Sequence, residues 1–143
     1  MATHNYTTND QAVVDLGNRV HKVEKLIDLG DFDVNSGDTL QCIKLPKGAV
    51  LHQGGAIVST PDTNAVDATV KVGSTAITGA LNADSAANTA VHKTDAVLTT
   101  GSLLITADDT LDILIETADS AGDGVILTYA EYGMLEAISN SEV

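Results

Sequence analysis

In the run Leu111-Asp112-Ile113-Leu114-Ile115-Glu116, apolar side chains stand at every second position. A period of two sends successive side chains to opposite faces of a β-strand, so positions 111, 113 and 115 are expected in the core. The same alternation occurs at 68–72 and at 125–129, where Val125, Leu127 and Tyr129 are the expected inward residues. Leu114 and Ile126 would then form apolar surface on the opposite face.

Further strands are expected on both sides of this run, at 22–29, 38–45, 50–59 and 102–106. Turn signals separate them: Pro46-Lys47-Gly48 closes one strand, 107–109 forms a turn and 118–124 forms a loop. The pair Gly54-Gly55 predicts a bulge or bend inside a strand. Residues 73–100 have weak periodicity, which predicts short strands joined by a long loop. Several short strands separated by turns predict an all-β sandwich or barrel.

Segment 13–27 allows two interpretations. Its apolar residues fall at spacings of three and four, which is typical of a helix, but Gly17-Asn18 interrupts the stripe. Residues 22–29 also alternate as a strand, and we favour that interpretation. We therefore divide the chain into a flexible N-terminal arm (1–18), a β-sandwich domain (19–135) and a polar C-terminal tail (136–143).

The charge of the chain excludes several classes of partner. Seven basic residues face 20 acidic ones, for a net charge of −13, and no Lys or Arg follows Lys93. Nucleic acids and anionic membranes are bound mainly through Lys and Arg, so neither is an expected partner. Phe, Trp and Tyr make up only 3% of the chain, which leaves few rings on which sugars or bases can stack.

No catalytic constellation is visible in the sequence. The four histidines are far apart and lack the spacing of metal ligands, so surface positions are expected. Cys42 lies in an apolar stretch, which favours a small buried side chain over a nucleophile. Acidic pairs such as Asp112 and Glu116 are more simply the solvated face of a strand than the carboxylates of a glycosidase. We expect neither enzymatic activity nor a cofactor. The sequence shows no signal peptide and no membrane span, so synthesis in a reducing cytoplasm is expected.

Two aspartate-rich stretches partly match calcium loops. Asp31, Asp33 and Asn35 take the first three ligand positions, but Cys42 stands at the twelfth, where such loops carry Glu. The stretch from Asp119 to Asp123 also departs from the calcium-loop pattern, because Ala121 stands at a ligand position. Asp, Asn, Ser and Gly also build Asx-type turns between strands, so turns are the first interpretation and calcium is the alternative.

Several stretches, read together, resemble the small decoration (cement) proteins of tailed-phage heads. These stretches are 25–29, 36–40 with its Gly-Asp-Thr, 43–51 with its Pro-Lys-Gly, 68–73 with its Val-Lys-Val-Gly, 107–113 with its Ala-Asp-Asp-Thr-Leu-Asp, and 124–132. Gly17-Asn18-Arg19 and His21-Lys22-Val23 are similar to the extended N-terminal arm of that family. The resemblance covers about residues 19–132. It differs after Gly73, where Ser74-Thr75-Ala76-Ile77 replaces an Asp-rich stretch.

This resemblance implies a β-sandwich of jelly-roll type that sits on the outer surface of a virion. It further implies trimers or other clusters without cofactor, most simply a homotrimer, that bridge subunits of the major capsid protein. Arg19, Lys22 and Lys25 put much of the scarce positive charge beside the arm, so we expect them to contact the capsid or a neighbouring copy. The alternative is a head-fibre or adhesin-like module that binds a host glycan or protein.

Overall fold

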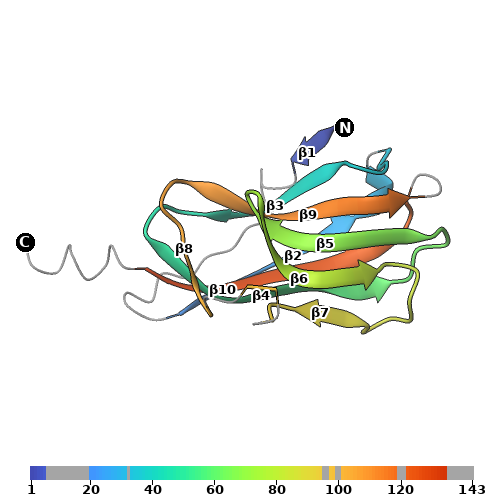
Figure 1. Ribbon diagram of the computed structural model, residues 1–143. Coiled ribbons are helices and arrows are strands. Elements are labelled where there is room, and N and C mark those ends of the chain that lie inside the picture. Colours follow the sequence, from blue (N-terminus) through green and yellow to red (C-terminus); the bar gives the residue numbers. More distant parts are fainter. Residues whose placement is uncertain (6–19, 32, 95–96, 99–100, 119–121, 135–143) are drawn as a thin grey trace, which may run out of the picture.

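The computed structural model describes residues 1–5, 20–31, 33–94, 97–98, 101–118 and 122–134 (Figure 1). One sheet has the strand order β1 (Thr3–Asn5), β3 (Thr39–Leu45), β9 (Asp109–Ala118), β5 (Val66–Val72) and β6 (Thr75–Asn82). The other has the order β2 (His21–Asp28), β10 (Val125–Met134), β4 (Ala49–Thr60) and β7 (Ala90–His92), and β8 (Leu103–Leu104) also pairs with β4. The described residues contain one short 3₁₀ helix, Leu29–Asp31, and no α-helix. The predicted all-β sandwich is confirmed.

The connections between the sheets make the sandwich a jelly roll. We number the eight strands that remain without the short β1 and β8 from 1 to 8 along the chain. The sheet that contains β2 then has the order 1-8-3-6, and the sheet that contains β3 has the order 2-7-4-5. Their pairings are antiparallel throughout. This arrangement of two Greek keys is the jelly-roll topology that the resemblance implied.

The core lies between the sheets and is aliphatic. Leu111, Ile113 and Ile115 of β9 are fully buried, as the alternation predicted. Cys42 is fully buried, and its Sγ donates to the carbonyl of Leu40 at 3.2 Å, which confirms the expected packing role. The strand interpretation of residues 22–29 is also confirmed, because β2 buries Val23 and Ile27.

The predicted inward face of β10 is wrong. Ile126 is 1% exposed and packs in the core, whereas Val125 and Leu127 lie half-buried on the outer face. Both faces of this strand are apolar, so the pattern does not tell them apart. Thr128 further obscures the polarity pattern, because it is a polar residue that faces the core. Its hydroxyl donates a hydrogen bond to the carbonyl of Gly55 at 3.1 Å.

A bulge does occur inside β4, as predicted, but not at Gly54-Gly55, since both residues keep a regular register with β10. The register shift lies nearby, where Glu131 and Tyr132 face Gln53 and Leu51. The glycine at 55 instead allows β7 to approach: a Cβ there would lie 2.2 Å from the carbonyl oxygen of Val91.

The N-terminal arm was predicted to be flexible, but its first five residues include a strand that pairs with the sandwich. β1 pairs in parallel with β3, with Thr3 opposite Thr39 (Figure 1). The buried Asp38 holds it there, because its carboxylate accepts the backbone N–H of Ala2 at 2.9 Å and lies 3.0 Å from Nε2 of His4. Burial alone would raise the pKa of Asp38, but hydrogen bonds from Asn35, Ala2 and His4 lower it. Residues 6–18 of the arm and the tail (136–143) lie outside the described residues.

Candidate interaction surfaces

The two ends of the sandwich differ in charge. We call the "β8 end" the end formed by the start of β2, the β3–β4 turn (46–48), the β5–β6 turn (73–74), β8 and residues 101–108. The opposite "acidic end" is formed by the described residues of the loops 29–38, 61–65, 83–89 and 118–124 (Figure 1). No Lys or Arg occurs in these four loops, whereas Lys22, Lys44, Lys47 and Lys71 lie at or beside the β8 end. The charge is therefore divided between the ends of the fold.

Carboxylates at the acidic end tie its loops together. Both oxygens of the buried Asp62 accept backbone N–H groups, from Asn64 at 2.8 Å, Asp123 at 2.8 Å and Gly124 at 2.9 Å. Asp123 in turn accepts the N–H of Thr63 at 2.8 Å as well as its hydroxyl, and these bonds lower the pKa of Asp123. These carboxylates serve as acceptors for loop backbone. The bond from Asn64 to Asp62 is a local Asx-type turn, whereas the bonds from Thr63, Asp123 and Gly124 join two loops that are far apart in the sequence.

The first partial calcium motif lies at this same end. Asn35 donates its side-chain amide to the carbonyl of Asp33 at 2.7 Å, which is turn geometry. Asp119 and Ala121 lie outside the described residues. Within the described part of the chain, no three His, Cys, Asp or Glu side chains gather as a metal site. No helix there is long and apolar enough to cross a membrane.

The β8 end combines lysines with exposed apolar side chains and two hollows. Val20 is 52% exposed and Leu104 is 51% exposed, which makes them two of the most exposed large apolar residues described. A hollow of about 190 Å³ lies between β8 and the β5–β6 turn. Exposed apolar groups mixed with charges are typical of protein interfaces, so this end is the stronger candidate for contact with another protein.

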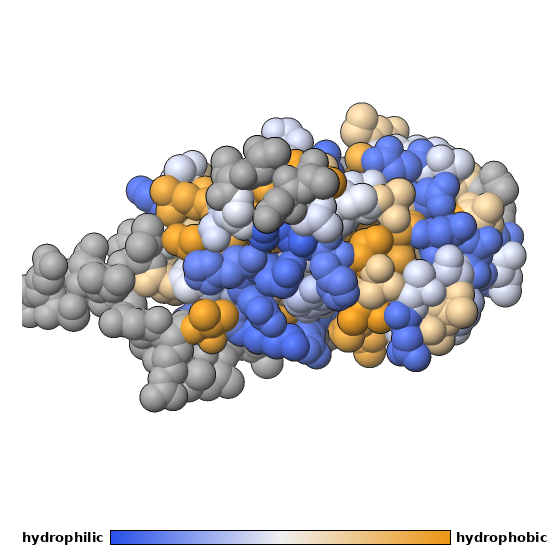
Figure 2. Space-filling model, turned by 60° about the horizontal axis from the view of Figure 1, so that its bottom comes forward, coloured by the Kyte–Doolittle hydropathy of each residue, from blue (hydrophilic) through white to orange (hydrophobic). Residues whose placement is uncertain are grey.

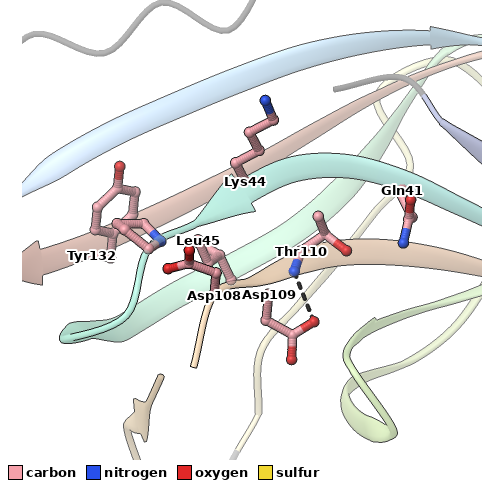
Figure 3. Close-up of a pocket in the computed structure, with 8 residues that line it drawn as sticks. Gln41, Lys44, Leu45, Asp108, Asp109, Thr110 and Tyr132 are labelled. Carbon is pink, nitrogen blue, oxygen red and sulfur yellow. Dashed lines mark hydrogen bonds between the residues drawn. The ribbon is translucent and has the colours of Figure 1, made fainter. Parts of the chain in front are cut away.

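A larger hollow of about 680 Å³ lies at the edge of β3 near the β8 end (Figure 3). One wall is formed by β3 and its turn, through Gln41, Lys44, Leu45 and Pro46. The other comes from Asp108, Asp109 and Thr110, with Tyr132 contributed by the opposite sheet. Asp108 is positioned by the turn, because its carboxylate accepts the N–H of Lys47 at 2.9 Å.

Asp112 pairs across the sheet with Gln41, which lines this hollow, and was misassigned from the sequence. The predicted solvated carboxylate is only 5% exposed, on the central strand β9 between Gln41 of β3 and Lys71 of β5. Burial raises the pKa of Asp112 to about 6, the charge of Asp109 adds to the rise, and a 2.6 Å hydrogen bond from the Thr110 hydroxyl opposes it. Glu116 is exposed, as predicted. No local sequence signal marks this burial, because it depends on the central position of β9, where neighbours on both sides cover a short side chain.

Asp112→Asn is expected to change how stability depends on pH. The raised pKa means that the folded protein binds this proton more tightly than the unfolded chain. The resulting stabilisation is fully present below the ordinary carboxyl pKa of about 4. It is lost as pH rises through about 6. The stability of the wild type relative to the variant should therefore fall between about pH 4 and about pH 7.5, as measured by urea unfolding. An unchanged difference across this window would contradict the assignment.

The outer face of the second sheet carries an apolar row crossed by polar residues. Leu26, Leu127, Ile57 and Ala90 are successive partners across β2, β10, β4 and β7. Beside this row, the Tyr129 ring lies over Gly55, and the Tyr129 hydroxyl is hydrogen-bonded to Nδ1 of His92. Seen from the side of β4 and β7, apolar patches alternate with polar ones (Figure 2). This mixture makes the face a weaker candidate than the β8 end.

The basic residues singled out from the sequence do not form one patch. Lys22 lies on the outer face of β2, 3.3 Å from Glu24 and with its ammonium 5.9 Å from the centre of the Tyr129 ring. Lys25 is an odd number of residues away and therefore belongs to the opposite face. Arg19 lies outside the described residues. Their contact with a partner stays a prediction.

The histidines are not all at the surface. His52 and His92 are exposed, as expected, but His21 is 5% exposed and stacks on Tyr132 with ring centres 5.4 Å apart. His4 is half-buried against Asp38. Each of these rings has a packing or hydrogen-bonding role within the sandwich.

The comparisons with known proteins identify the fold. No protein-family model matches the chain, and a comparison with curated protein sequences finds no match. A chain from the capsid of Ralstonia phage GP4 superposes with a TM-score of 0.67 at 12% identity, over 92% of this chain and 97% of that chain. A chain from the cyanophage Pam1 capsid asymmetric unit gives 0.61 at 15% identity, over 90% and 97%.

A third similar chain comes from the acid-stable capsid structure of Helicobacter pylori bacteriophage KHP30, with a TM-score of 0.57 at 11% identity, over 87% of this chain and 93% of that chain. Because the coverage is high on both sides, the likeness extends over nearly the whole of each chain. At these identities the comparison establishes a common fold.

Proposed function

We propose that this protein is a non-enzymatic structural component of a phage virion that decorates the capsid and stabilises it by bridging major capsid protein subunits. The observation that carries the proposal is the near-complete mutual coverage with chains found in phage capsids. The jelly roll, the aliphatic core and the division of charge between the two ends support it. A small domain that binds many equivalent positions on a lattice gains stabilisation through the sum of modest contacts.

The β8 end suits contact with the capsid, and the acidic end suits contact with solvent. The β8 end offers exposed apolar side chains and lysines, whereas the acidic end presents like charges that repel another acidic surface. Lys22 lies at the β8 end, so the predicted contact through Arg19, Lys22 and Lys25 belongs to this proposal. We further propose a homotrimer. Sedimentation of the free protein at trimer mass supports a preformed trimer, and sedimentation only as a monomer at high concentration contradicts it.

Co-sedimentation with capsids tests the proposed function. The partner is the capsid assembled from the major capsid protein of the same phage. We expect saturable binding at a fixed number of copies per capsid, and decorated capsids that resist heating better than bare ones. A glycan array serves as the counter-test: absence of capsid binding together with a specific glycan signal would contradict decoration and favour a head-fibre or adhesin-like module.

Deleting residues 2–18 is expected to weaken capsid occupancy severalfold while leaving the fold intact. Without β1 the Asp38 carboxylate becomes solvated, so the unfolding free energy should fall by only about 1–2 kcal/mol, as for a few partly exposed hydrogen bonds. Deletion of 136–143 is the matched control. A truncated protein that fails to fold would place the arm in the core. Unchanged capsid binding would exclude a binding role for the arm.

A further inference from the structure

β2 has an open edge. Among the described residues it pairs only with β10, so it is the last strand of its sheet. The N–H of Leu29 donates to the carbonyl of Gly124 at 2.9 Å, and the register of β2 with β10 is regular up to this point. In an antiparallel pair, hydrogen-bonded and non-hydrogen-bonded positions alternate. Odd-numbered residues of β2 therefore bond β10, and even-numbered residues direct their backbone N–H and C=O groups to the open edge.

The same even-numbered residues carry the exposed side chains of this edge. Val20, which directly precedes β2, is 52% exposed, and Leu26 is 60% exposed. Between them, Lys22 and Glu24 form an exposed ion pair on the outer face, with 3.3 Å between Nζ and Oε1. The order along the edge is thus apolar, basic, acidic, apolar. The other long edge strand, β6, has no charged residue and no exposed large apolar side chain.

This order is complementary to itself when the strand is reversed. If a second copy lies antiparallel along the edge, Val20 faces Leu26 of the second copy and Lys22 faces its Glu24, and each pair occurs twice. A register shifted by two residues in either direction would put two copies of Lys22, or two copies of Glu24, opposite each other. Opposite charges stabilise a cross-strand pair and like charges destabilise it. Charges on edge strands ordinarily discourage pairing, but the order found here favours one register.

We propose that the β2 edge binds β2 of a second copy of this protein across a two-fold axis perpendicular to the sheet. The two strands pair antiparallel about Val23, so that the sheets of both copies join into one. The even-numbered residues exchange backbone hydrogen bonds, and the charged side chains of the two copies form an alternating array. Val20 of one copy packs on Leu26 of the other, beside a hollow of about 380 Å³ that Leu26 and Leu127 help to line.

A two-fold contact uses the same surface on both copies, so it joins two copies and does not close a ring of three. In the proposed homotrimer, it links a copy in one trimer to a copy in the next. Only this placement rests on the proposed function. Because few residues pair, we expect the contact to be weak between free molecules. Copies fixed side by side on a lattice have a high effective concentration, which strengthens it.

Disulfide trapping with the free, full-length protein tests the contact and its register. Opposite residues of a hydrogen-bonded antiparallel pair have Cα atoms about 5.5 Å apart, which suits a disulfide. A mixture of Lys22→Cys and Glu24→Cys proteins should therefore cross-link severalfold faster under oxidising conditions than either variant alone. Cys42 does not compete, because it is fully buried and burial raises the pKa of its thiol. Equal rates in the three samples, or no cross-linked dimer in any, would overturn the proposal.

Charge reversal tests the complementarity itself, with a mixture of Val20→Cys and Leu26→Cys proteins as the reporter. Adding Lys22→Glu to both proteins should slow cross-linking at least about tenfold, because both ion pairs between the copies become repulsive. Adding Glu24→Lys should do the same, and the double reversal should restore the original rate. The matched control is Asp84→Lys, which changes the net charge as Glu24→Lys does but lies exposed at the acidic end, and it should not slow cross-linking.

Failure of the double reversal to restore cross-linking, or an equal effect of Asp84→Lys and Glu24→Lys, would reject the β2 contact. Capsid co-sedimentation tests the proposed function separately. Capsid binding without the β2 cross-link would leave decoration standing and reject only this contact. Cross-linking of the free protein without capsid binding would do the reverse.

Discussion

Asp62→Ala is expected to lower the unfolding free energy by about 3–5 kcal/mol, because a buried acceptor shared by several donors is lost. Asp62 is 4% exposed and accepts three backbone N–H groups, two of them from the end of the loop that leads into β10. Alanine leaves these donors without an acceptor, and Gly124 packs too closely for rearrangement, since a Cβ there would lie 2.9 Å from the backbone nitrogen of Asp62.

The matched control is Asp123→Ala in the same pair of loops. Its carboxylate also accepts a backbone N–H, from Thr63, but at an exposed position where water replaces it. We therefore expect a much smaller loss of stability. Chemical denaturation followed by circular dichroism measures both variants. Equal losses would mean that the Asp62 network does not hold the acidic end together.

Ile126→Ala and Leu127→Ala are expected to differ sharply although the residues are adjacent in β10. Ile126 is 1% exposed in the core, so its truncation should cost about 2–5 kcal/mol through lost burial and the cavity left behind. Leu127 lies half-buried on the outer face beside Leu26 and Ile57, and its loss should cost less than about 1 kcal/mol. The same unfolding measurement compares them. A larger loss of stability for Leu127→Ala would mean that Leu127 and not Ile126 faces the core, as expected from the sequence.

Sequence periodicity predicted the strands whose two faces differ in polarity. β9 and β5 alternate clearly, and both were assigned as strands, with positions 111, 113 and 115 of β9 correctly placed in the core but Asp112 wrongly placed in solvent. β10 is apolar on both faces, so its direction depends on contacts that no local pattern contains, such as the bond from Thr128 to Gly55. β8 was expected at 102–106 but pairs only over Leu103–Leu104. The jelly-roll order itself came from the family resemblance, because periodicity carries no information about which strands pair.

The candidate sites depended on long-range neighbours and were mostly missed. The hollow joins residues of the β3 region, the start of β9 and Tyr132, which are far apart in the sequence. Asp112 is buried because β9 is central in its sheet, and β1 exists because the distant Asp38 accepts its N-terminal groups. The sequence revealed the uneven distribution of charge, but it suggested that basic and acidic residues are separated between the N-terminal and C-terminal parts of the chain. The fold places that division between the two ends of the sandwich, because antiparallel strands bring distant loops together.

Hydrogen–deuterium exchange of the protein on and off the capsid tests the central claim most directly. If the protein decorates a capsid through its β8 end, exchange should slow on binding in the β3–β4 turn (46–48) and in 101–108. The acidic-end loops 29–38, 61–65 and 83–89 should exchange at the same rate in both states. Protection confined to the acidic-end loops would reverse the proposed orientation, and no protection at either end in the presence of saturating capsids would contradict decoration itself.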